Sequence, residues 1–402
     1  HDNEIVDNSG WGIYFYDARD AGVITGNTIT GNFRSGIIPA TSIPAPSDGN
    51  VLMPNGIDGL WIRGNTRSSD LRLPYLDDGV NRLRTYQIYG TLTTAPGTTL
   101  TVDPGVIVKF VANAKLAAGG AIEALGTEAL PIAFTSETDD HWGGDFNNDG
   151  GATTPRDGSW YGVRLDSNAS APMSHFTNVT FAYGGAQDSG MFYGYNNRSA
   201  SFESCSFHNS STNGLRMYRG AATLVNCEAW GNRGDGLHFE YDGTHDVTGG
   251  RFFGNTGDGI EYTQNATGTI SGAELFANNG FGLRANVAVS APGDWWGAVD
   301  GPSGSGPGAG DEISGTVAMG AGGDDFLLDG SEFSYIDAGG ANLQAYGLSS
   351  PIVTGSPSSE WGTTPGESIV FDMDNQLITA EIAGLTPTAA YALHVTYLNR
   401  DV

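Results

Sequence analysis

The segment from Asp145 to Gly150 reads DFNNDG, so Asp145, Asn147 and Asp149 stand at alternate positions ahead of a glycine. Calcium-binding loops use this spacing, because alternate oxygen-bearing side chains converge on one cation and glycine permits the sharp turn. An EF-hand needs a glutamate at the twelfth loop position, where this chain has Arg156. Asp157 or a backbone carbonyl would complete a shorter calcium loop. We therefore expect structural calcium at Asp145, Asn147, Asp149 and Asp157, with a solvated acidic turn as the alternative.

A second group of reactive side chains is found in four short runs of the sequence. In each run, the reactive residue directly follows an apolar residue. If these runs are strands stacked in register, the apolar side chains point inward and the residues that follow them form one outward column. The inward set is Leu215, Leu237, Ile260 and Leu283, and the outward set is Arg216, His238, Glu261 and Arg284. The next outward column would hold Tyr218, Glu240, Thr263 and Asn286, with Arg164 and Asp166 beginning the two columns in an earlier coil.

Three functions are open to such a face. Opposite charges that alternate along a column stabilise a solvated sheet. A glycan could instead contact Arg216, Tyr218, His238, Glu240, Glu261 and Arg284. Catalysis is the third: Glu240 and Glu261 as a glycosidase pair about 5 to 9.5 Å apart, or His238 and Arg216 as the base and cation of a lyase. We favour a non-catalytic face, because Glu261 would lie between two arginines on an open, shallow sheet, where nothing keeps a carboxyl protonated.

A sequence repeat would position these side chains. Asn209, Asn232, Asn255 and Asn278 follow one another at 23-residue intervals, and the Asn-x-x-x-Gly pattern of the last three also begins at Asn8, Asn32 and Asn55. A fixed period of this size indicates one unit stacked on copies of itself. Each unit holds short alternating runs separated by Gly, Asn and Asp, which excludes helical repeats. We expect a parallel β-solenoid with coils about 4.8 Å apart and the four asparagines as an inward ladder at a turn.

The chain resembles right-handed parallel β-helix repeat proteins of the pectin-lyase-like superfamily, in particular large secreted bacterial surface proteins. The resemblance rests on these coils, on Asn27–Asn32 and on the segment 90–136. The segment Gly293-Asp-Trp-Trp-Gly297 resembles the element that closes such helices. The resemblance implies an all-β, right-handed parallel β-helix over roughly residues 1–320. It leaves the function open, because that superfamily includes lyases, hydrolases, epimerases and adhesins.

The expected organisation has five parts. Residues 1–65 end a first set of coils, 66–85 form a charged connecting excursion, and 86–300 form the main β-helix with an insertion at 137–158. A glycine-rich linker follows at 301–340, and alternating runs in 341–402 indicate the start of a partial β-sandwich. Because the chain begins in mid-coil and ends on a strand, we expect either a fragment of a longer polypeptide with further domains or end-to-end self-assembly.

Composition bears on partners and location. The formal net charge is -27, from 45 acidic and 18 basic residues, which disfavours nucleic acid as a partner. No apolar run is long enough for a membrane span. Cys205 and Cys227 fall at equivalent coil positions, so they are expected to stack as two buried thiols, with a disulfide as the alternative. The overall expectation is an extracellular or cell-surface protein with a structural, adhesive or glycan-contacting role, and a polysaccharide lyase or glycoside hydrolase as the competing class.

Overall fold

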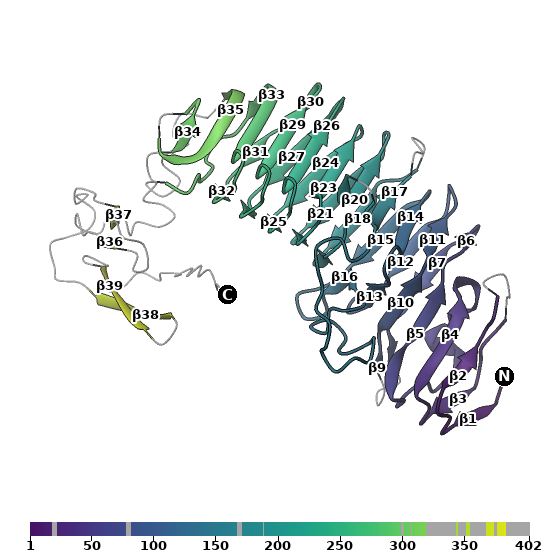
Figure 1. The fold of residues 1–402 in the computed structure, drawn as a ribbon. Coiled ribbons are helices and arrows are strands. Elements are labelled where there is room, and N and C mark those ends of the chain that lie inside the picture. Colours follow the sequence, from purple (N-terminus) through teal and green to yellow (C-terminus); the bar gives the residue numbers. More distant parts are fainter. Residues whose placement is uncertain are drawn as a thin grey trace.

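The computed structural model describes residues 1–17, 22–77, 82–166, 171–187, 189–298, 301–306 and 308–318, and four short strands beyond them. Its body is a solenoid of three sheets of parallel strands, and most coils contribute one strand to each sheet (Figure 1). The period-2 runs of the sequence form these strands, and the Gly, Asn and Asp clusters form the corners. The parallel β-helix expected from the repeat is therefore confirmed.

The first sheet has 11 strands. They are β2 (Trp11–Tyr14), β4 (Arg34–Pro39), β5 (Ile57–Arg63), β10 (Thr85–Tyr89), β13 (Ile107–Phe110), β16 (Ile132–Ser136), β19 (Val179–Ala182), β22 (Ser206–His208), β25 (Glu228–Trp230), β28 (Arg251–Phe253) and β32 (Glu274–Phe276).

The second sheet, which carries the predicted outward columns, also has 11 strands. They are β6 (Thr66–Arg67), β11 (Thr91–Thr94), β14 (Lys115–Ala118), β17 (Gly162–Leu165), β20 (Gly190–Tyr195), β23 (Asn213–Tyr218), β26 (Leu237–Glu240), β29 (Ile260–Thr263), β33 (Leu283–Ser290), β35 (Gly310–Ala318) and β34 (Pro302–Gly304).

The third sheet contains β7 (Leu71–Leu73), β12 (Thr99–Val102), β15 (Ala121–Leu125), β18 (Ser174–Thr177), β21 (Ala200–Glu203), β24 (Ala222–Val225), β27 (Gly243–Thr248) and β30 (Ala266–Thr267), while β31 (Ile270–Ser271) also pairs with β27. Smaller elements are β1 (Glu4–Val6) paired with β3 (Thr28–Thr30), the 3-10 helices η1 (Ala40–Ser42) and η2 (Pro46–Asp48), and the hairpin β8 (Leu76–Asp77) with β9 (Arg82–Leu83).

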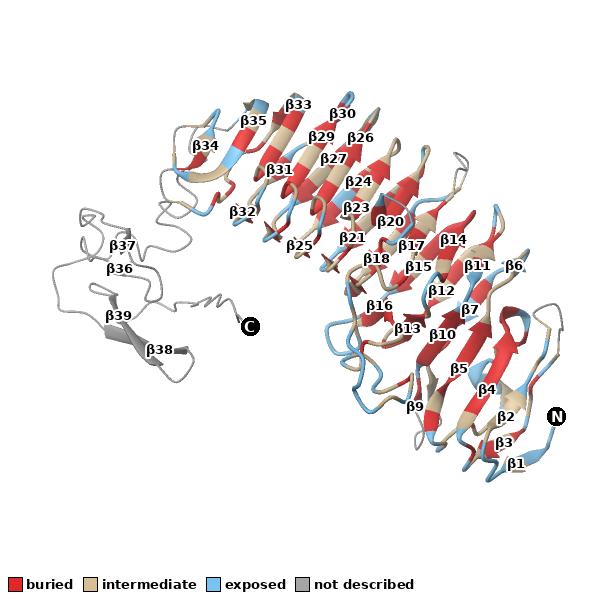
Figure 2. Cartoon of the chain, viewed as in Figure 1, coloured by how far each residue is buried: buried red, intermediate tan, exposed pale blue. Residues whose placement is uncertain are grey.

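The core runs along the inside of the stack. Figure 2 shows buried residues along the strands and exposed ones mainly in the connecting segments. Leu215, Leu237, Ile260 and Leu283 are fully buried, as their alternation predicted. Equivalent aromatic rings stack from coil to coil: the ring centroids of Phe134 and Phe181 are 5.2 Å apart, and those of Phe181 and Phe207 are 5.1 Å apart. Each coil thus buries its apolar face against its neighbours, which is the packing that stabilises a solenoid.

The asparagine ladder is present, but its predicted register is wrong at one end. Asn232 donates its side-chain amide to Asn255 and Asn255 donates to Asn278, at 2.9 and 3.0 Å. Asn209 stands outside this ladder, because the β22–β25 register matches Ser206 with Glu228 and so places Ser210, not Asn209, beside Asn232. One coil is a residue shorter than the asparagine spacing implied. Asn8, Asn32 and Asn55 form a similar ladder near the other end.

The expected boundary at 66–85 differs from the structure. Strand β5 pairs directly with β10, and β6 and β7 pair with β11 and β12, so the first coils and the later ones form one continuous stack. Among the described residues of this segment, only the hairpin β8–β9 departs from the stack. Arg72 lies on the outer surface of a coil, where it forms an ion pair with Asp103 at 2.8 Å.

The insertion at 137–158 lies between β16 and β17 and packs on the outside of the first sheet. Phe146 is buried and stacks on Trp61, with ring centroids 4.3 Å apart. The ammonium of Lys109 donates to the carbonyls of Asp139 and Gly144, at 2.9 and 2.7 Å. Burial lowers the pKa of Lys109 to about 8, although nearby carboxylates raise it. A buried ring and a buried ammonium therefore fix this loop on the sheet.

The far end of the solenoid is closed by the segment that resembled a closing element. Trp296 is buried in the core, and Asp294 accepts a hydrogen bond from the backbone of Ala273. The predicted linker partly forms strands, because β35 pairs with β33 and the Asp311 carboxylate accepts the last amide of the ladder from Asn278. Farther on, β36 (Leu343–Gln344) pairs with β37 (Pro351–Val353), and β38 (Glu367–Met373) forms an antiparallel pair with β39 (Gln376–Ile382). The rest of the expected sandwich lies outside the described residues.

Candidate functional site

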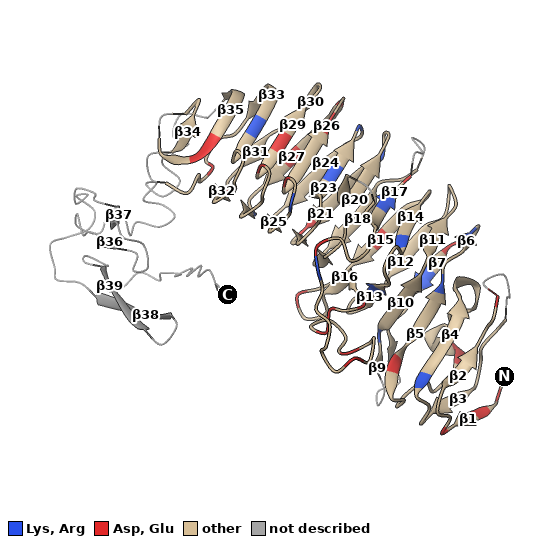
Figure 3. Ribbon diagram, viewed as in Figure 1, with Lys and Arg blue, Asp and Glu red and all other residues tan. Residues whose placement is uncertain are grey.

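The second sheet carries the outward columns in the register that the alternation predicted. In the strand register, Arg216 lies beside His238, His238 beside Glu261, and Glu261 beside Arg284. Tyr218, Glu240 and Thr263 follow one another in the adjacent column. Asn286 is exposed and lies where the pairing of β33 with β35 shifts register. Figure 3 shows the alternation of basic and acidic residues along β23, β29 and β33.

His238 is the centre of a compact cluster. Its Nδ1 lies 2.9 Å from Oδ2 of Asp235 and 2.8 Å from Oε2 of Glu261. Burial lowers the pKa of His238, but hydrogen bonds to Asp235 and Glu261 outweigh it and raise that pKa to about 9. The imidazole is therefore protonated at neutral pH and cannot accept a proton there.

The carboxylates around His238 are held by the backbone and by Arg284. Oδ1 of Asp235 accepts the backbone N–H of Asp258, and Oδ1 of Asp258 accepts that of Phe281. Burial raises the pKa of Asp258 to about 6, against the opposing effects of the Phe281 N–H and Arg284. Burial also raises the pKa of Asp235, but its hydrogen bond with His238 leaves a net lowering. Arg284 lies 2.9 Å from Asp258 and 3.7 Å from Glu261.

The guanidinium of Arg216 forms its ion pair with Glu240 rather than with Glu261. The side chain of Arg216 reaches across from its own column to the neighbouring column, which contains Glu240. Its Nε donates to Oε2 of Glu240 at 3.0 Å. The expectation of open, solvated glutamates is wrong: only 12% of the side-chain surface of Glu240 and of Glu261 is exposed. Their charged partners, in close contact with them, account for this shielding.

Aromatic and guanidinium groups continue the same face beyond the charged cluster. We call Arg164, Tyr193, Tyr195, Arg216 and Tyr218 the Tyr–Arg strip. The guanidinium of Arg164 lies 4.5 Å from the ring centre of Tyr195, and that of Arg216 lies 5.4 Å from that of Tyr193. The rings of Tyr195 and Tyr218 stack with centroids 5.6 Å apart. Sequence reasoning missed Tyr193 and Tyr195, because their coil lacks the Asn-x-x-x-Gly pattern; the alternation in Met-Phe-Tyr-Gly-Tyr marks them.

The predicted calcium loop is folded around its own carboxylates. Asp145 accepts the backbone N–H groups of Asp149 and Gly150 at 3.0 and 2.8 Å, and Asn147 donates to Asp149 at 2.9 Å. Ligand oxygens of Asp140, Asp145 and Asp149 lie within 4.8 Å of one another. Burial, and then the charge of Asp145, raises the pKa of Asp140.

Two of the residues around this loop differ from the prediction. Asp157 lies apart from the cluster and forms an ion pair with Arg233 at 2.8 Å. The structure therefore places Asp140, rather than the predicted Asp157, beside Asp145 and Asp149.

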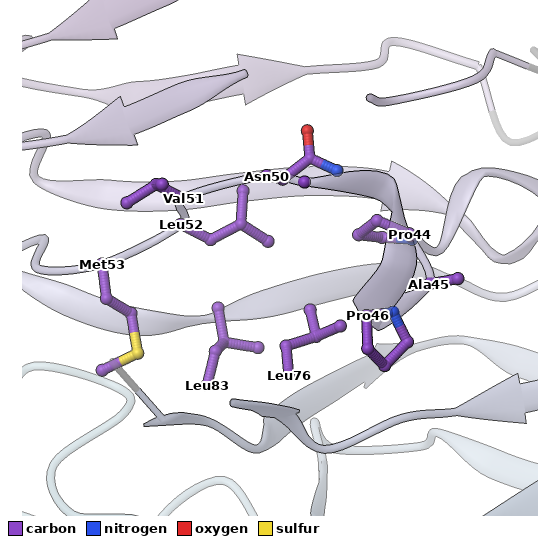
Figure 4. Close-up of a pocket in the computed structure, with 10 residues that line it drawn as sticks. Pro44, Ala45, Pro46, Asn50, Val51, Leu52, Met53, Leu76 and Leu83 are labelled. Carbon is purple, nitrogen blue, oxygen red and sulfur yellow. The ribbon is translucent and has the colours of Figure 1, made fainter. Parts of the chain in front are cut away.

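Two hollows lie away from these groups. The first, of about 180 Å³, is where the hairpin β8–β9 meets the segment around η2, and Figure 4 shows Leu76 and Leu83 on one side of it and Leu52 on the other. None of the described residues that line it is ionisable. The second, of about 440 Å³, lies over the outer face of the third sheet, where Nδ1 of His175 is 2.7 Å from Oγ of Ser201.

The two cysteines are free and buried. Burial raises the pKa of Cys205 well above its ordinary value, so this thiol behaves as a small apolar group.

Comparison with known proteins agrees with this architecture. Residues 157–290 match the family model described as "Right handed beta helix region". A search of curated proteins finds no match. A similar solved structure is a mutant of the periplasmic alginate epimerase AlgG, at 10% identity and a TM-score of 0.26, covering 65% of this chain and 77% of that chain. The match over residues 157–290 and the three-sheet stack both show a right-handed parallel β-helix fold. None of the helices in the described part of the chain is long and apolar enough to cross a membrane.

Proposed function

We propose that the chain is an extracellular or cell-surface β-helix scaffold that contacts an extended polysaccharide along the outer face of the second sheet and does not cleave it. The Tyr–Arg strip carries this proposal. Tyr193 is only 8% exposed, because the guanidinium groups of Arg164 and Arg216 lie over its ring. The other four residues offer aromatic rings, phenol hydroxyls and guanidinium N–H groups, which together suit the apolar ring faces, the hydroxyls and the carboxylates of sugars.

The direction of the strip supports an extended ligand. Arg164, Tyr193 and Arg216 occupy one column in three successive strands, and Tyr195 and Tyr218 occupy the next. Equivalent residues in successive coils are about 4.8 Å apart, so the strip runs along the solenoid axis. A linear glycan lying on this axis would meet the same kinds of group coil after coil.

The competing function is that of a polysaccharide lyase or glycoside hydrolase using Glu240, Glu261, His238 and Arg216. The specific observation in its favour is the shielding of Glu240 and Glu261, since catalytic carboxyls need such surroundings. Against it, Glu240 is occupied by Arg216, and His238 is hydrogen-bonded to two carboxylates. These contacts engage the groups that catalysis would use, as in a structural charge ladder.

A polysaccharide panel tests the proposal. The protein is incubated with neutral and uronate-containing polysaccharides, with and without millimolar calcium, and both retention on the polysaccharide and chain cleavage are measured. We expect retention without new reducing ends and without the ultraviolet absorbance of unsaturated products. Either product signal, abolished in His238→Gln or Glu240→Gln, would replace this proposal with the enzymatic one.

A further inference from the structure

Asp235, His238 and Glu261 bring one ligand atom each to within 4.8 Å of one another. Asp235 and His238 come from one coil, and Glu261 comes from the next, directly beside His238 in the sheet. The cluster differs from the acidic loop at Asp145, because its central atom is an imidazole nitrogen. Imidazole nitrogen with carboxylate oxygen is a common ligand set for zinc.

Hydrogen bonding alone does not satisfy this cluster. Nδ1 of His238 carries at most one hydrogen, yet carboxylate oxygens of both Asp235 and Glu261 lie at hydrogen-bonding distance from it, at 2.9 and 2.8 Å. One proton is thus shared between two carboxylates. A divalent cation in place of that proton would bind all three atoms and balance both negative charges.

We propose that Asp235, His238 and Glu261 form a binding site for a first-row divalent transition-metal ion, with zinc as its best-fitting occupant. Zinc binds nitrogen and oxygen ligands at about 2.0 to 2.2 Å. In the tetrahedral arrangement that zinc prefers, two ligands at about 2.1 Å from the ion are about 3.4 Å apart. The observed contacts of 2.8 and 2.9 Å are shorter than this by about 0.5 Å, so side-chain movements of that order create the site.

The surroundings hold the ligands in place before any ion binds. Oδ1 of Asp235 accepts the backbone N–H of Asp258 at 2.8 Å, which leaves Oδ2 directed to His238. Oε1 of Glu261 faces Arg284, which leaves Oε2 directed to His238. Outer contacts of this kind orient metal ligands. Exposed fractions of 12 to 16% keep the three side chains shielded but reachable from solvent.

The Asp235→Asn variant tests the site with little risk to folding. The preceding coil already has Asn213 at the equivalent position, where its Oδ1 accepts the backbone N–H of Asp235. An asparagine at 235 can therefore keep the bond to Asp258 while it removes the carboxylate that faces His238. His238→Gln is the second variant. Glu228→Gln is the matched control, because it removes a carboxylate that pairs with Arg251 on the first sheet.

The measurement is isothermal titration of the metal-stripped full chain with zinc, supported by the visible absorption of bound cobalt(II), which reports the coordination geometry. We expect one zinc per chain, with affinity reduced by about 100-fold or more in Asp235→Asn and His238→Gln, the upper end of what a lost outer contact costs. Glu228→Gln should bind as the wild type does. No zinc binding by the wild type, or equal binding by folded Asp235→Asn, would overturn the proposal. If Asp235→Asn does not fold, the same comparison with His238→Gln decides.

Discussion

The side-chain amide of Asn232 donates to Oδ1 of Asn255 at 2.9 Å, and the same oxygen accepts the backbone N–H of Asn232 at 3.2 Å. The side-chain oxygen of each ladder asparagine thus accepts hydrogen bonds from both the side-chain amide and the backbone N–H of the asparagine in the preceding coil. Asn255 is fully buried, and its own amide also donates to the carbonyl of Ala229. The ladder therefore supplies buried partners that water cannot replace.

Asn255→Ala should lower the free energy of unfolding by ~3 kcal/mol, because several buried donors and acceptors lose their partner and each costs about 1 to 3 kcal/mol. Asn209→Gly is the control, since Asn209 has a φ of 55° and Gly231 and Gly254 occupy the equivalent corner in later coils. Thermal unfolding of both variants checks this. A loss in Asn209→Gly equal to that in Asn255→Ala would contradict the register described here.

Calcium should stabilise the insertion loop through Asp145, Asn147 and Asp149. Ligand present at 100 times its Kd stabilises a folded protein by about 2.7 kcal/mol. Millimolar calcium should therefore raise the melting temperature, and a chelator should reverse the rise. Asp149→Asn should abolish the effect, whereas Asp157→Asn should retain it, because Asp157 pairs with Arg233 instead. A melting temperature indifferent to calcium and chelator would rule out structural calcium.

The contact between Arg216 and Glu240 should act as a partly buried ion pair. Their side chains are 18% and 12% exposed, so removing one partner leaves the other charge poorly solvated. Arg216→Met should destabilise the fold by ~2 kcal/mol, and the double variant with Glu240→Leu should recover part of that loss. Double-mutant-cycle analysis of urea unfolding measures the coupling. Additive effects would show that the pair contributes nothing to stability.

His245 should make the fold sensitive to acid. It is fully buried, its ring stacks on Phe239 with centroids 4.4 Å apart, and neither ring nitrogen has a hydrogen-bond partner. Burial lowers its pKa to about 3, while an unfolded histidine titrates near 6.5. Between these values the unfolded state binds the extra proton, so stability is lost as pH falls from about 6.5 toward 3.

The corresponding test compares the wild type with His245→Phe at pH 7 and pH 5. One pKa unit corresponds to about 1.4 kcal/mol, so the wild type should lose about 2 kcal/mol more than the variant over this interval. Guanidinium unfolding at both values measures the difference. Parallel losses in the two proteins would assign the acid sensitivity to other groups, such as His208, whose pKa burial also lowers.

Periodicity predicted the sheets and the outward columns, because a residue that alternates with a buried leucine or isoleucine has only one face to occupy. It did not predict the cluster at His238. Asp235 lies at a corner before β26, and its approach to His238 depends on the backbone bond to Asp258. The one-residue error at Asn209 has a similar cause: a corner can lose a residue without changing the strands beside it. The calcium motif predicted that Asp145 and Asp149 lie together. The path of the loop brings Asp140 to them and carries Asp157 away to Arg233.

Polysaccharide binding by variants of the Tyr–Arg strip tests the proposed function most directly. Affinity electrophoresis through gels that contain each polysaccharide of the panel would compare the wild type with Tyr195→Ala and Tyr218→Ala, and with Phe253→Ala on the first sheet as the control. We expect at least one polysaccharide to retain the wild type and the control. Each tyrosine variant should bind about tenfold more weakly, equivalent to about 1.4 kcal/mol. Undiminished retention of both tyrosine variants, or no retention of the wild type by any polysaccharide, would contradict the proposed function.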